Sequence, residues 1–336
     1  MSYAPYEPST RHVPSPASAP ALFESRVGRD AARPIEIGLV NNMPDAALRS
    51  TERQIRSLLE RSCGDLRFNL RVYAIPEMPR SEMGRELARN YHDIAELWNT
   101  ALDGIIVSGT EPRNEDLRNE PYWYTLTRLM EWADEHTTSS IWSCLAAHAA
   151  LLHMDGIERQ RLGQKRFGVF ECTRETDHFL TQGLPERLSM PHSRWNELKL
   201  EDLVAAGYSV LTRSTEAGAD AFMKQRKSLF LFFQGHPEYD ADTLLLEYRR
   251  DIGRYLRGER ETYPTVPCGC FDGAVLKGLQ FLRLLAARHR DESTLAAFPL
   301  AMATSHAENT WRETAAALYR NWLQYLAVNS MRVCAG

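Results

Sequence analysis

The sequence has no long uninterrupted apolar stretch and no large excess of charge of either sign. None of its 336 residues falls in a run of about eighteen apolar residues, so no membrane span is expected. The chain carries 40 lysines and arginines against 44 aspartates and glutamates, a net charge of −4. Binding the phosphates of a nucleic acid requires a concentrated basic face, so nucleic acid is not expected as a partner.

Cysteine is scarce as well. Six cysteines are spread irregularly along the chain, at Cys63, Cys144, Cys172, Cys268, Cys270 and Cys334. This spacing does not form a disulfide framework, so we expect free thiols in a reducing compartment and a cytoplasmic protein. The Cys268-Gly269-Cys270 motif lacks a second Cys or His pair at metal-ligand spacing. We therefore interpret it as a loop, and we expect neither a metal nor a resident cofactor.

Residues 1–33 lack the apolar segment that a secretory signal contains. This stretch is instead rich in proline, serine and alanine, with scattered charges. We expect it to form a mobile N-terminal arm, either free or wrapped over the surface, rather than part of the core.

The chain does contain a regular alternation of apolar, β-prone runs with amphipathic segments. The expected strands lie at 35–40, 66–75, 102–107 and 141–142. Helices are expected between them, beginning at residue 50 and covering 83–97 and 122–132. This alternation predicts an α/β fold, in which a parallel sheet carries helices on both faces. Because the carboxyl ends of parallel strands meet at one edge, Asn41, Gly109 and Cys144 should converge there.

The second half of the chain has a mixed pattern. Strands are expected at 208–211 and 228–233, and helices at about 241–256, 274–287 and 310–326. Residues 258–273 hold several prolines and glycines and are expected to form a linker, whereas 290–308 is loop-like. We therefore predict a main domain over 34–262 and a C-terminal part, 263–336, whose linker and helices pack on it. The apolar stripe of the last helix, which includes Leu318 and Trp322, is interpreted as a packing feature.

Cys144 follows a short apolar run and precedes an alanine- and leucine-rich segment that reaches Leu152. A strand followed at once by a helix predicts a sharp elbow, which lifts the side chain at the turn clear of the sheet. The unpaired N–H groups at the start of the helix favour a thiolate there. Free cysteines are more often buried apolar residues, so the assignment of Cys144 as a nucleophile depends on partners elsewhere.

His236 and Glu238 supply those partners. They follow the apolar run at 228–233 and stand two positions apart, with Pro237 between them. In an extended chain, residues two apart point to the same side. A carboxylate beside an imidazole fixes its tautomer and supports its charged form, and the imidazole can take a proton from a thiol. Cys144, His236 and Glu238 are therefore predicted to be nucleophile, base and orienting carboxylate.

These residues resemble a known family. A cysteine elbow followed by His-Pro-Glu occurs in class I glutamine amidotransferases. It also occurs in the homoserine O-acyltransferases (the homoserine O-succinyltransferase family), which use the same flavodoxin-like fold. The second resemblance is closer and extends over residues 35–265 and 310–327. It depends on the strings LVNNMP at 39–44, DGIIVSG at 103–109, PHSR at 191–194, GHPEYD at 235–240 and NWL at 321–323.

The resemblance implies an acyltransferase that moves a succinyl group from succinyl-CoA to the hydroxyl of L-homoserine, in methionine biosynthesis. Cys144 would be acylated as a thioester and CoA would leave. Homoserine would then attack with His236 as base, in ping-pong order. The oxyanion would sit on backbone N–H groups, those of Leu145 and of the loop at Gly109 and Thr110.

Further residues match family positions that hold or select the substrates. Lys165, Ser193 and Arg250 match those that hold the amino acid, and the guanidinium of Arg250 suits its carboxylate. Arg113 aligns with the position associated with the choice between succinyl and acetyl, and a cation there favours succinyl. Glu111 and Glu115 are near enough in sequence that a shifted alignment would reverse the charge. Acetyl-CoA as donor and a related amino alcohol as acceptor therefore stay open as alternatives.

Two other interpretations share this residue set. A glutaminase-type amidotransferase subunit usually has small glycines around its cysteine, where this chain has Trp142 and Ala146. A binding module without catalysis is disfavoured by the complete Cys, His and Glu set. The resemblance also suggests a homodimer, and the apolar C-terminal helix is the candidate contact.

Overall fold

The fold is built on a single sheet of ten strands. The computed structural model describes residues 33–305 and 307–330, so the arm expected at 1–33 lies, apart from its last residue, outside the described residues. The strand order across the sheet is β3-β2-β1-β4-β5-β10-β9-β8-β6-β7. The strands are β1 (Ile35–Val40), β2 (Phe68–Ala74), β3 (His92–Asp93), β4 (Gly104–Val107), β5 (Ser139–Ser143), β6 (Gln160–Arg174), β7 (Arg187–Glu197), β8 (Ser209–Ser214), β9 (Gly218–Gln225) and β10 (Leu229–Phe233).

The half of the sheet from β3 to β10 is parallel. Its central strands are buried throughout, as in GIIV of β4 and LFLFF of β10. Strands buried on both faces read as continuous apolar runs, which is why the sequence showed them clearly. This half confirms the predicted α/β fold, and it brings the carboxyl ends of β1, β4, β5 and β10 to one edge of the sheet.

The other half of the sheet is antiparallel. Strands β9, β8, β6 and β7 pair in this way, and β9 joins them to β10. The connections from β8 to β9 and from β9 to β10 are turns too short to hold a crossover helix, so each of these strands reverses the direction of the one before. The sheet therefore contains more strands than the four predicted parallel ones. One of the added strands, β10 from the second half of the chain, pairs with β5.

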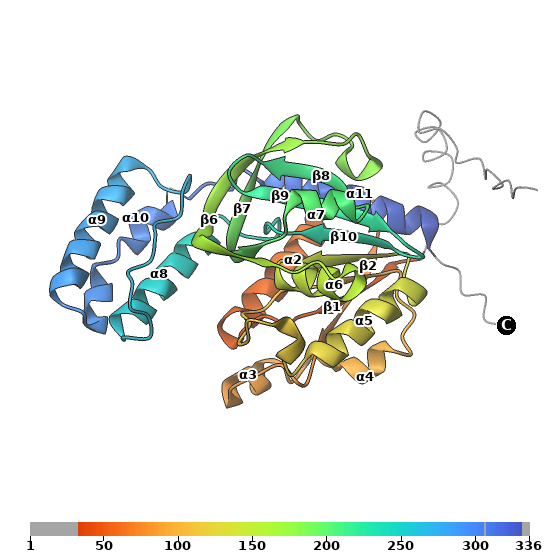
Figure 1. Cartoon of the computed structure of the whole chain (residues 1–336), viewed down its shortest axis with the longest axis horizontal. Helices are drawn as coiled ribbons and strands as arrows, with labels where there is room; N and C mark the ends of the chain where they lie inside the picture. Colours follow the sequence, from red (N-terminus) through yellow and green to blue (C-terminus); the bar gives the residue numbers. More distant parts are fainter. Residues whose placement is uncertain (1–32, 306, 331–336) are drawn as a thin grey trace, which may run out of the picture.

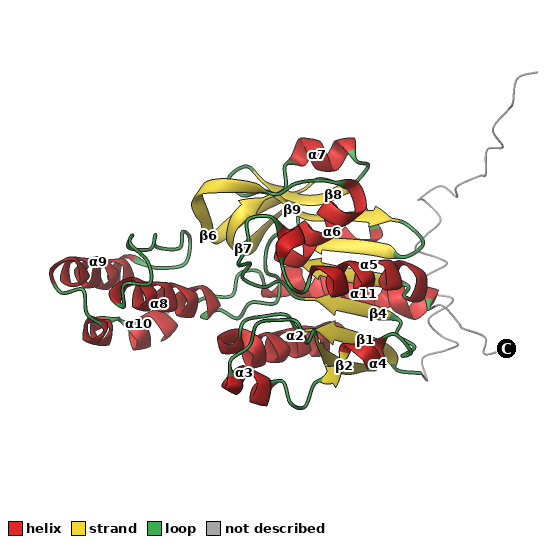
Figure 2. Ribbon diagram, turned by 60° about the horizontal axis from the view of Figure 1, so that its bottom comes forward, coloured by secondary structure: helices red, strands yellow, loops and turns green. Residues whose placement is uncertain are grey.

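Helices cover both faces of the sheet (Figures 1 and 2). One apolar cluster joins α5 and α6 to one face, and a second joins α2 and α11 to the other. The helices of this body are α2 (Leu48–Ser62), α3 (Glu82–Leu87), α4 (Ile94–Leu97), α5 (Trp123–His136), α6 (Leu145–Asp155), α7 (Leu200–Ala205) and α11 (Arg312–Asn329), with 3-10 turns η2 (Asp45–Ala47), η3 (Leu117–Asn119) and η4 (Phe179–Thr181). The charged segment 83–97, expected as one helix, forms α3 and α4 with β3 between them. No helix of the described residues is both long and apolar enough to cross a membrane.

The last helix, α11, is buried against the sheet. Trp322 is fully buried, and its indole N–H donates a hydrogen bond to Ser139 Oγ at 3.0 Å. Gly104 leaves room for this ring, because a Cβ there would lie 2.9 Å from Trp322 Cζ2. Leu318 and Leu326 are also fully buried. The stripe therefore packs within its own chain and is not available for a dimer contact.

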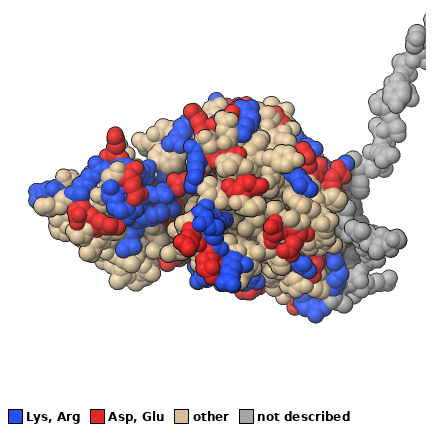
Figure 3. All heavy atoms as spheres, turned by 90° about the horizontal axis from the view of Figure 1, so that it is seen from below, with Lys and Arg blue, Asp and Glu red and all other residues tan. Residues whose placement is uncertain are grey.

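A helical lobe projects beside the antiparallel half of the sheet (Figure 1). It consists of α8 (Thr243–Leu256), α9 (Gly273–Arg288), η5 (Glu292–Ala297) and α10 (Leu300–Ser305). These elements share an apolar cluster around Tyr248 and Leu279, which differs from the two clusters on the faces of the sheet but includes Phe167 of β6. The segment 290–308, expected as a loop, thus contains η5 and α10. Lysine and arginine side chains gather on the face of the lobe in Figure 3.

Candidate active site

Cys144 stands at the turn between β5 and α6. Its φ of 51° and ψ of −112° make it the one residue other than glycine with positive φ in the described part of the chain. Its N–H donates to Phe233 O at 2.7 Å, and its carbonyl accepts the N–H of His148 at 3.1 Å. Non-glycine residues adopt such a conformation only where surrounding structure holds it. Strand β10 and the first turn of α6 provide that support, as the sequence predicted for an elbow.

His236 and Glu238 lie beside the elbow, because β10 is the parallel neighbour of β5. His236 Nδ1 and Glu238 Oε1 are 2.9 Å apart, and the two side chains are 7% and 8% exposed. The other ring nitrogen is thereby left for the Cys144 thiol, which lies near enough to raise the pKa of the imidazole. Burial acts to lower the pKa of His236, but Glu238 and the thiol outweigh it, so the pKa lies well above its usual value. The structure therefore brings the predicted nucleophile, base and carboxylate together.

Gly109, at the end of β4, lies directly against the elbow. A Cβ at this position would be 3.1 Å from Leu145 N, 3.1 Å from Ser143 O and 3.3 Å from Cys144 Cβ. Only a residue without a side chain allows this approach. Leu145 is the first residue of α6, where backbone N–H groups have no partner within the helix. The backbone of Leu145 and of the loop at Gly109 and Thr110 therefore borders the space in front of the sulfur.

The three residues expected to hold the amino acid converge on two acidic residues of α8. Lys165 Nζ lies 3.1 Å from Asp251 Oδ2 and 3.6 Å from Glu247 Oε2. The hydroxyl of Ser193 donates to Glu247 Oε2, and Arg250 donates to Asp251 Oδ1 at 3.1 Å. The Lys165 side chain is 10% exposed, whereas that of Arg250 is 39% exposed. Strands β6 and β7 and helix α8 thus build one charged pocket.

Tyr239 links this charged pocket to the imidazole. Its ring stacks on His236 with centroids 4.3 Å apart, and its hydroxyl donates to Glu247 Oε1 at 2.6 Å. Burial, together with Glu247, raises the pKa of Tyr239 well above its usual value, so the phenol stays protonated. The sequence argument missed Tyr239, Glu247 and Asp251 as site residues. The i,i+4 spacing of Glu247 and Asp251 places them on one face of a helix, which is a signal that could have found them.

The loop after Gly109 carries the residue expected to select the donor. The side chain of Arg113 is exposed, and its backbone N–H donates to Glu120 Oε1 at 2.6 Å. Glu111 instead forms a bidentate pair with Arg254, at 3.1 and 3.0 Å. Burial acts to raise the pKa of Glu111, but Arg254 outweighs it, so the net shift is downward and the carboxylate stays charged. The carboxylate of Glu111 is therefore paired with Arg254 of α8, whereas the guanidinium of Arg113 is exposed to solvent.

A second cation near the sulfur, Arg159, was not anticipated. It donates to the carbonyls of Asn114 and Glu115 at 3.1 and 2.8 Å, and so ties down the loop that carries Arg113. Burial lowers the pKa of Arg159 overall, against opposing effects from neighbouring acidic groups that include the Cys144 thiol. The guanidinium is thus within electrostatic reach of the nucleophile. Arg159 lies in the irregular segment directly before β6, and no sequence pattern there marks it as a site residue.

Cys172, His192 and Asp220 form a buried cluster whose ligand atoms lie within 4.8 Å of one another. Arg194 Nε is 3.4 Å from His192 Nδ1, so that nitrogen accepts a hydrogen bond and Nε2 carries the proton. Nε2 lies 3.4 Å from Asp220 Oδ1. Neither His192 Nε2 nor Asp220 Oδ1 has a hydrogen-bond partner among the described residues. A protonated Nε2 cannot bind a metal, so these residues fit a buried contact between imidazole and carboxylate rather than a metal site. The Cys268-Gly269-Cys270 segment is a loop bridged to Gly168, as interpreted from the sequence.

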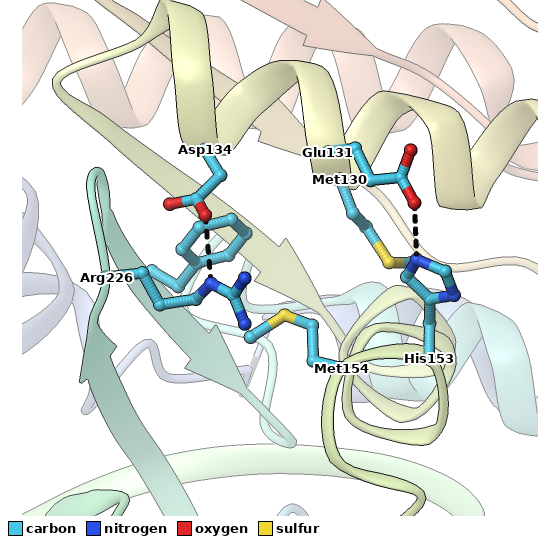
Figure 4. Close-up of a pocket in the computed structure, with 7 residues that line it drawn as sticks. Met130, Glu131, Asp134, His153, Met154 and Arg226 are labelled. Carbon is cyan, nitrogen blue, oxygen red and sulfur yellow. Dashed lines mark hydrogen bonds and ion pairs between the residues drawn. The ribbon is translucent and has the colours of Figure 1, made fainter.

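A cavity of about 170 Å³ lies among α5, α6 and β10 (Figure 4). Its charged residues are paired: Asp134 with Arg226 at 2.9 Å and Glu131 with His153 at 3.1 Å. Arg226 precedes β10, so the cavity is at the amino ends of the strands and Cys144 is at the carboxyl ends. Ligands of parallel α/β sheets bind at the carboxyl ends, and this cavity therefore carries no part of the site.

A cysteine at a strained elbow, beside a His–Glu pair that follows the neighbouring strand, is the arrangement expected of α/β enzymes with a cysteine nucleophile. A family model described as homoserine O-succinyltransferase matches residues 15–332. The homoserine O-succinyltransferase of Rhodopseudomonas palustris is 48% identical over 95% of this chain and 97% of its own length, and that of Bradyrhizobium japonicum is 46% identical over 94% and 97%. The chain belongs to the homoserine O-succinyltransferase family.

Solved structures show similarity at the level of the fold. The crystal structure of SMU.1228c is 13% identical with a TM-score of 0.51, and the alignment covers 87% of this chain and 99% of that one. A glutamine amidotransferase from Thermotoga maritima is 12% identical with a TM-score of 0.46, over 88% and 99%. The family resemblance stated from the motifs is confirmed by the family model and by the two relatives, not by these structures.

Proposed function

We propose that this chain transfers a succinyl group from succinyl-CoA to the hydroxyl of L-homoserine, in the cytoplasm and as a step of methionine biosynthesis. The observation that carries the proposal is the placement of Cys144 beside the hydrogen-bonded pair of His236 and Glu238 at the carboxyl edge of the sheet. Relatives that align over nearly the whole chain bear the name of this activity.

In the first half-reaction, Cys144 Sγ attacks the carbonyl carbon of the donor thioester. His236 takes the thiol proton and Glu238 stabilises the imidazolium that results. The bond between the carbonyl carbon and the sulfur of CoA then breaks, and His236 returns the proton to the departing CoA thiolate. The oxyanion of the tetrahedral intermediate is held by backbone N–H groups of Leu145 and of the loop at Gly109 and Thr110.

In the second half-reaction, the homoserine hydroxyl attacks the Cys144 thioester. His236 removes the hydroxyl proton, the new C–O bond forms, and the bond from carbon to Cys144 breaks. The charged pocket suits a zwitterionic amino acid. Arg250 is a fork-shaped donor for its carboxylate, and Glu247 is an anion beside Lys165 and Ser193 for its ammonium group.

The succinyl donor is favoured over acetyl by two cations, one on the loop after β4 and one near the nucleophile. Arg113 is exposed on the loop after β4, and Arg159 lies within electrostatic reach of Cys144. The terminal carboxylate of a succinyl group would be attracted by both, whereas an acetyl group has no charge to match. Glu111, which a shifted alignment would place at the selecting position, is neutralised by Arg254.

Intact-mass spectrometry after addition of donor alone tests the proposal. Succinyl-CoA should add one succinyl group at Cys144 and release free CoA, and homoserine should then remove the adduct. A folded protein with a free Cys144 that gains no mass from succinyl-CoA or acetyl-CoA would contradict the mechanism. Release of ammonia from glutamine without any CoA-dependent transfer would instead favour an amidotransferase subunit.

The family resemblance also leads us to propose a homodimer. Since the stripe of α11 is buried in its own chain, any such contact has to use another surface. Light scattering coupled to gel filtration would give the mass in solution, and a monomer would contradict this point without affecting the chemistry.

A further inference from the structure

A pocket beside the amino-acid residues is lined by Trp195 and several cations. It lies between β6, β7 and the segment after α8, and its walls include Lys165, Asp251 and Arg260. The guanidinium of Arg161 lies over the Trp195 ring at 4.7 Å, and that of Arg260 lies 5.5 Å from the same ring. Cation–π contacts hold both guanidinium groups next to one indole. Arg260 thus lines the pocket itself, and Arg161 lies on the tryptophan that forms one of its walls.

The cations in this region exceed the acidic groups that could neutralise them. Asp251 lies within 4.0 Å of four basic side chains, those of Lys165, Arg250, Arg254 and Arg260. Arg161 is exposed, and within the described residues it has no ion-pair partner. The unneutralised charge makes the pocket a place where an anion would be attracted.

We propose that Arg161 and Arg260, held by Trp195, bind the phosphates at the nucleotide end of the CoA donor. This inference rests on the proposed function for the identity of the donor. The diphosphate and the 3′-phosphate of CoA are multiply charged acceptors, and arginine pairs bind such groups in bidentate fashion. The hydroxyls of Thr262 and Thr265 also line the pocket and can donate to phosphate oxygens.

A continuous set of residue contacts joins the pocket to the catalytic histidine. A chain of contacts leads from the pocket through Lys165 to Glu247, from Glu247 to Tyr239, and from the Tyr239 ring to His236. The thioester must reach Cys144, next to His236, and the flexible pantetheine arm separates it from the phosphates. The donor would therefore enter over the charged pocket, and it would leave before the amino acid occupies that space, as a ping-pong order requires.

The test compares succinyl-CoA with succinyl-N-acetylcysteamine, a donor that keeps the thioester but lacks the nucleotide. Arg161→Ala and Trp195→Leu should raise KM for succinyl-CoA about tenfold, the loss expected for one charge-assisted contact, and leave kcat unchanged. KM for the truncated donor should not change. Arg128→Ala is a matched control. Arg128 is on α5, and its guanidinium also lies over an indole, that of Trp98, at 4.4 Å, but outside the pocket. Equal effects on both donors, or no effect on either, would overturn the inference.

Calorimetric titration with CoA itself separates this inference from the proposed function. CoA should bind the native chain, more weakly as salt rises, and about tenfold more weakly to Arg161→Ala. If CoA binds in this way but no succinyl transfer occurs, the phosphate site stands and the proposed function fails. If transfer occurs and the Arg161 variant binds CoA as well as the native chain does, the phosphate site is refuted and the function stands.

Discussion

The elbow around Cys144 and the charged pocket on α8 are built in different ways. The elbow is fixed by backbone: two parallel strands end side by side, a helix begins at once, and Gly109 fits against the turn. The charged pocket is fixed by side chains, through ion pairs that join Lys165 of β6 to Glu247 and Asp251 of α8. The first region places atoms that react, and the second places charges that recognise.

This difference indicates what each region contributes to the kinetics. Groups held by backbone and buried core are already in position for the transition state, so their loss should lower kcat. Charged groups that only hold the bound amino acid bind ground state and transition state alike, so their loss should mainly raise KM. Substitutions in the two regions can therefore confirm or refute the division.

The largest effect is expected at the nucleophile. Cys144→Ala should lower kcat by at least about 10³-fold and abolish the succinyl adduct, because no other group can accept the acyl chain. Cys63→Ala, which removes a partly exposed thiol from the end of α2, is the control and should leave both unchanged. Residual transfer in Cys144→Ala at near-native rate would mean that the elbow is not the reacting centre.

Glu238→Gln should lower kcat by about a hundredfold, because the amide cannot stabilise the imidazolium. The pH profile gives a second readout. Glu238 contributes to the raised pKa of His236, so its loss lowers that pKa. Attack by homoserine needs neutral His236, whose fraction grows as pH rises through the pKa. The rate of thioester breakdown in single turnovers should thus reach its plateau at lower pH in the variant. If the rise of this rate moved to higher pH in the variant, Glu238 would not be the group that raises the pKa of His236.

The elbow could be predicted because its signals are local in sequence. An apolar strand, Cys144 and a helix-forming segment are contiguous, and His236 and Glu238 follow another apolar strand directly. Buried parallel strands such as β4 and β10 also identify themselves by their uninterrupted apolar runs. Because the carboxyl ends of parallel strands lie at one edge of a sheet, these separate segments could be predicted to lie close together.

The charged pocket could not be assembled from sequence without a resemblance. Lys165, Ser193 and Glu247 belong to three elements whose proximity depends on how β6, β7 and α8 pack, and no periodicity encodes that. Nothing in the sequence distinguishes Asp251 from an exposed helix residue, whereas in the fold four basic side chains lie within 4.0 Å of it. For a similar reason, the sequence predicts that the apolar stripe of α11 is buried. It does not say whether the stripe packs on its own chain or on a partner.

Gly109→Ala tests whether the approach of β4 to the elbow matters. The added Cβ would lie 3.1 Å from Leu145 N, which is closer than an ordinary van der Waals contact, so the oxyanion groups must shift. We expect kcat to fall about thirtyfold, with KM for homoserine little changed. Gly163→Ala is the control, because a Cβ there meets nothing within 4 Å. An unchanged kcat would remove this loop from the oxyanion site.

Arg250→Ala should act on the other side of the division. The loss of a bidentate partner for the amino-acid carboxylate should raise KM for homoserine about tenfold, while formation of the Cys144 thioester from donor keeps its native rate. Arg249→Ala, one residue earlier on α8, is the matched control. A slower acylation step in Arg250→Ala with native KM would show that the charged pocket takes part in the chemistry, and the comparison would fail.

Arg113→Glu should give the smallest effect. Its side chain is exposed, so its attraction for a succinyl carboxylate is screened by water and salt. We expect the ratio of kcat/KM for succinyl-CoA to that for acetyl-CoA to fall about threefold, with an intermediate value for Arg113→Gln. Because Arg159 also lies near the sulfur and is partly buried, part of the preference should survive in Arg113→Glu and disappear when Arg159→Gln is added. A preference that is unchanged in the double variant would place the choice of donor outside this loop.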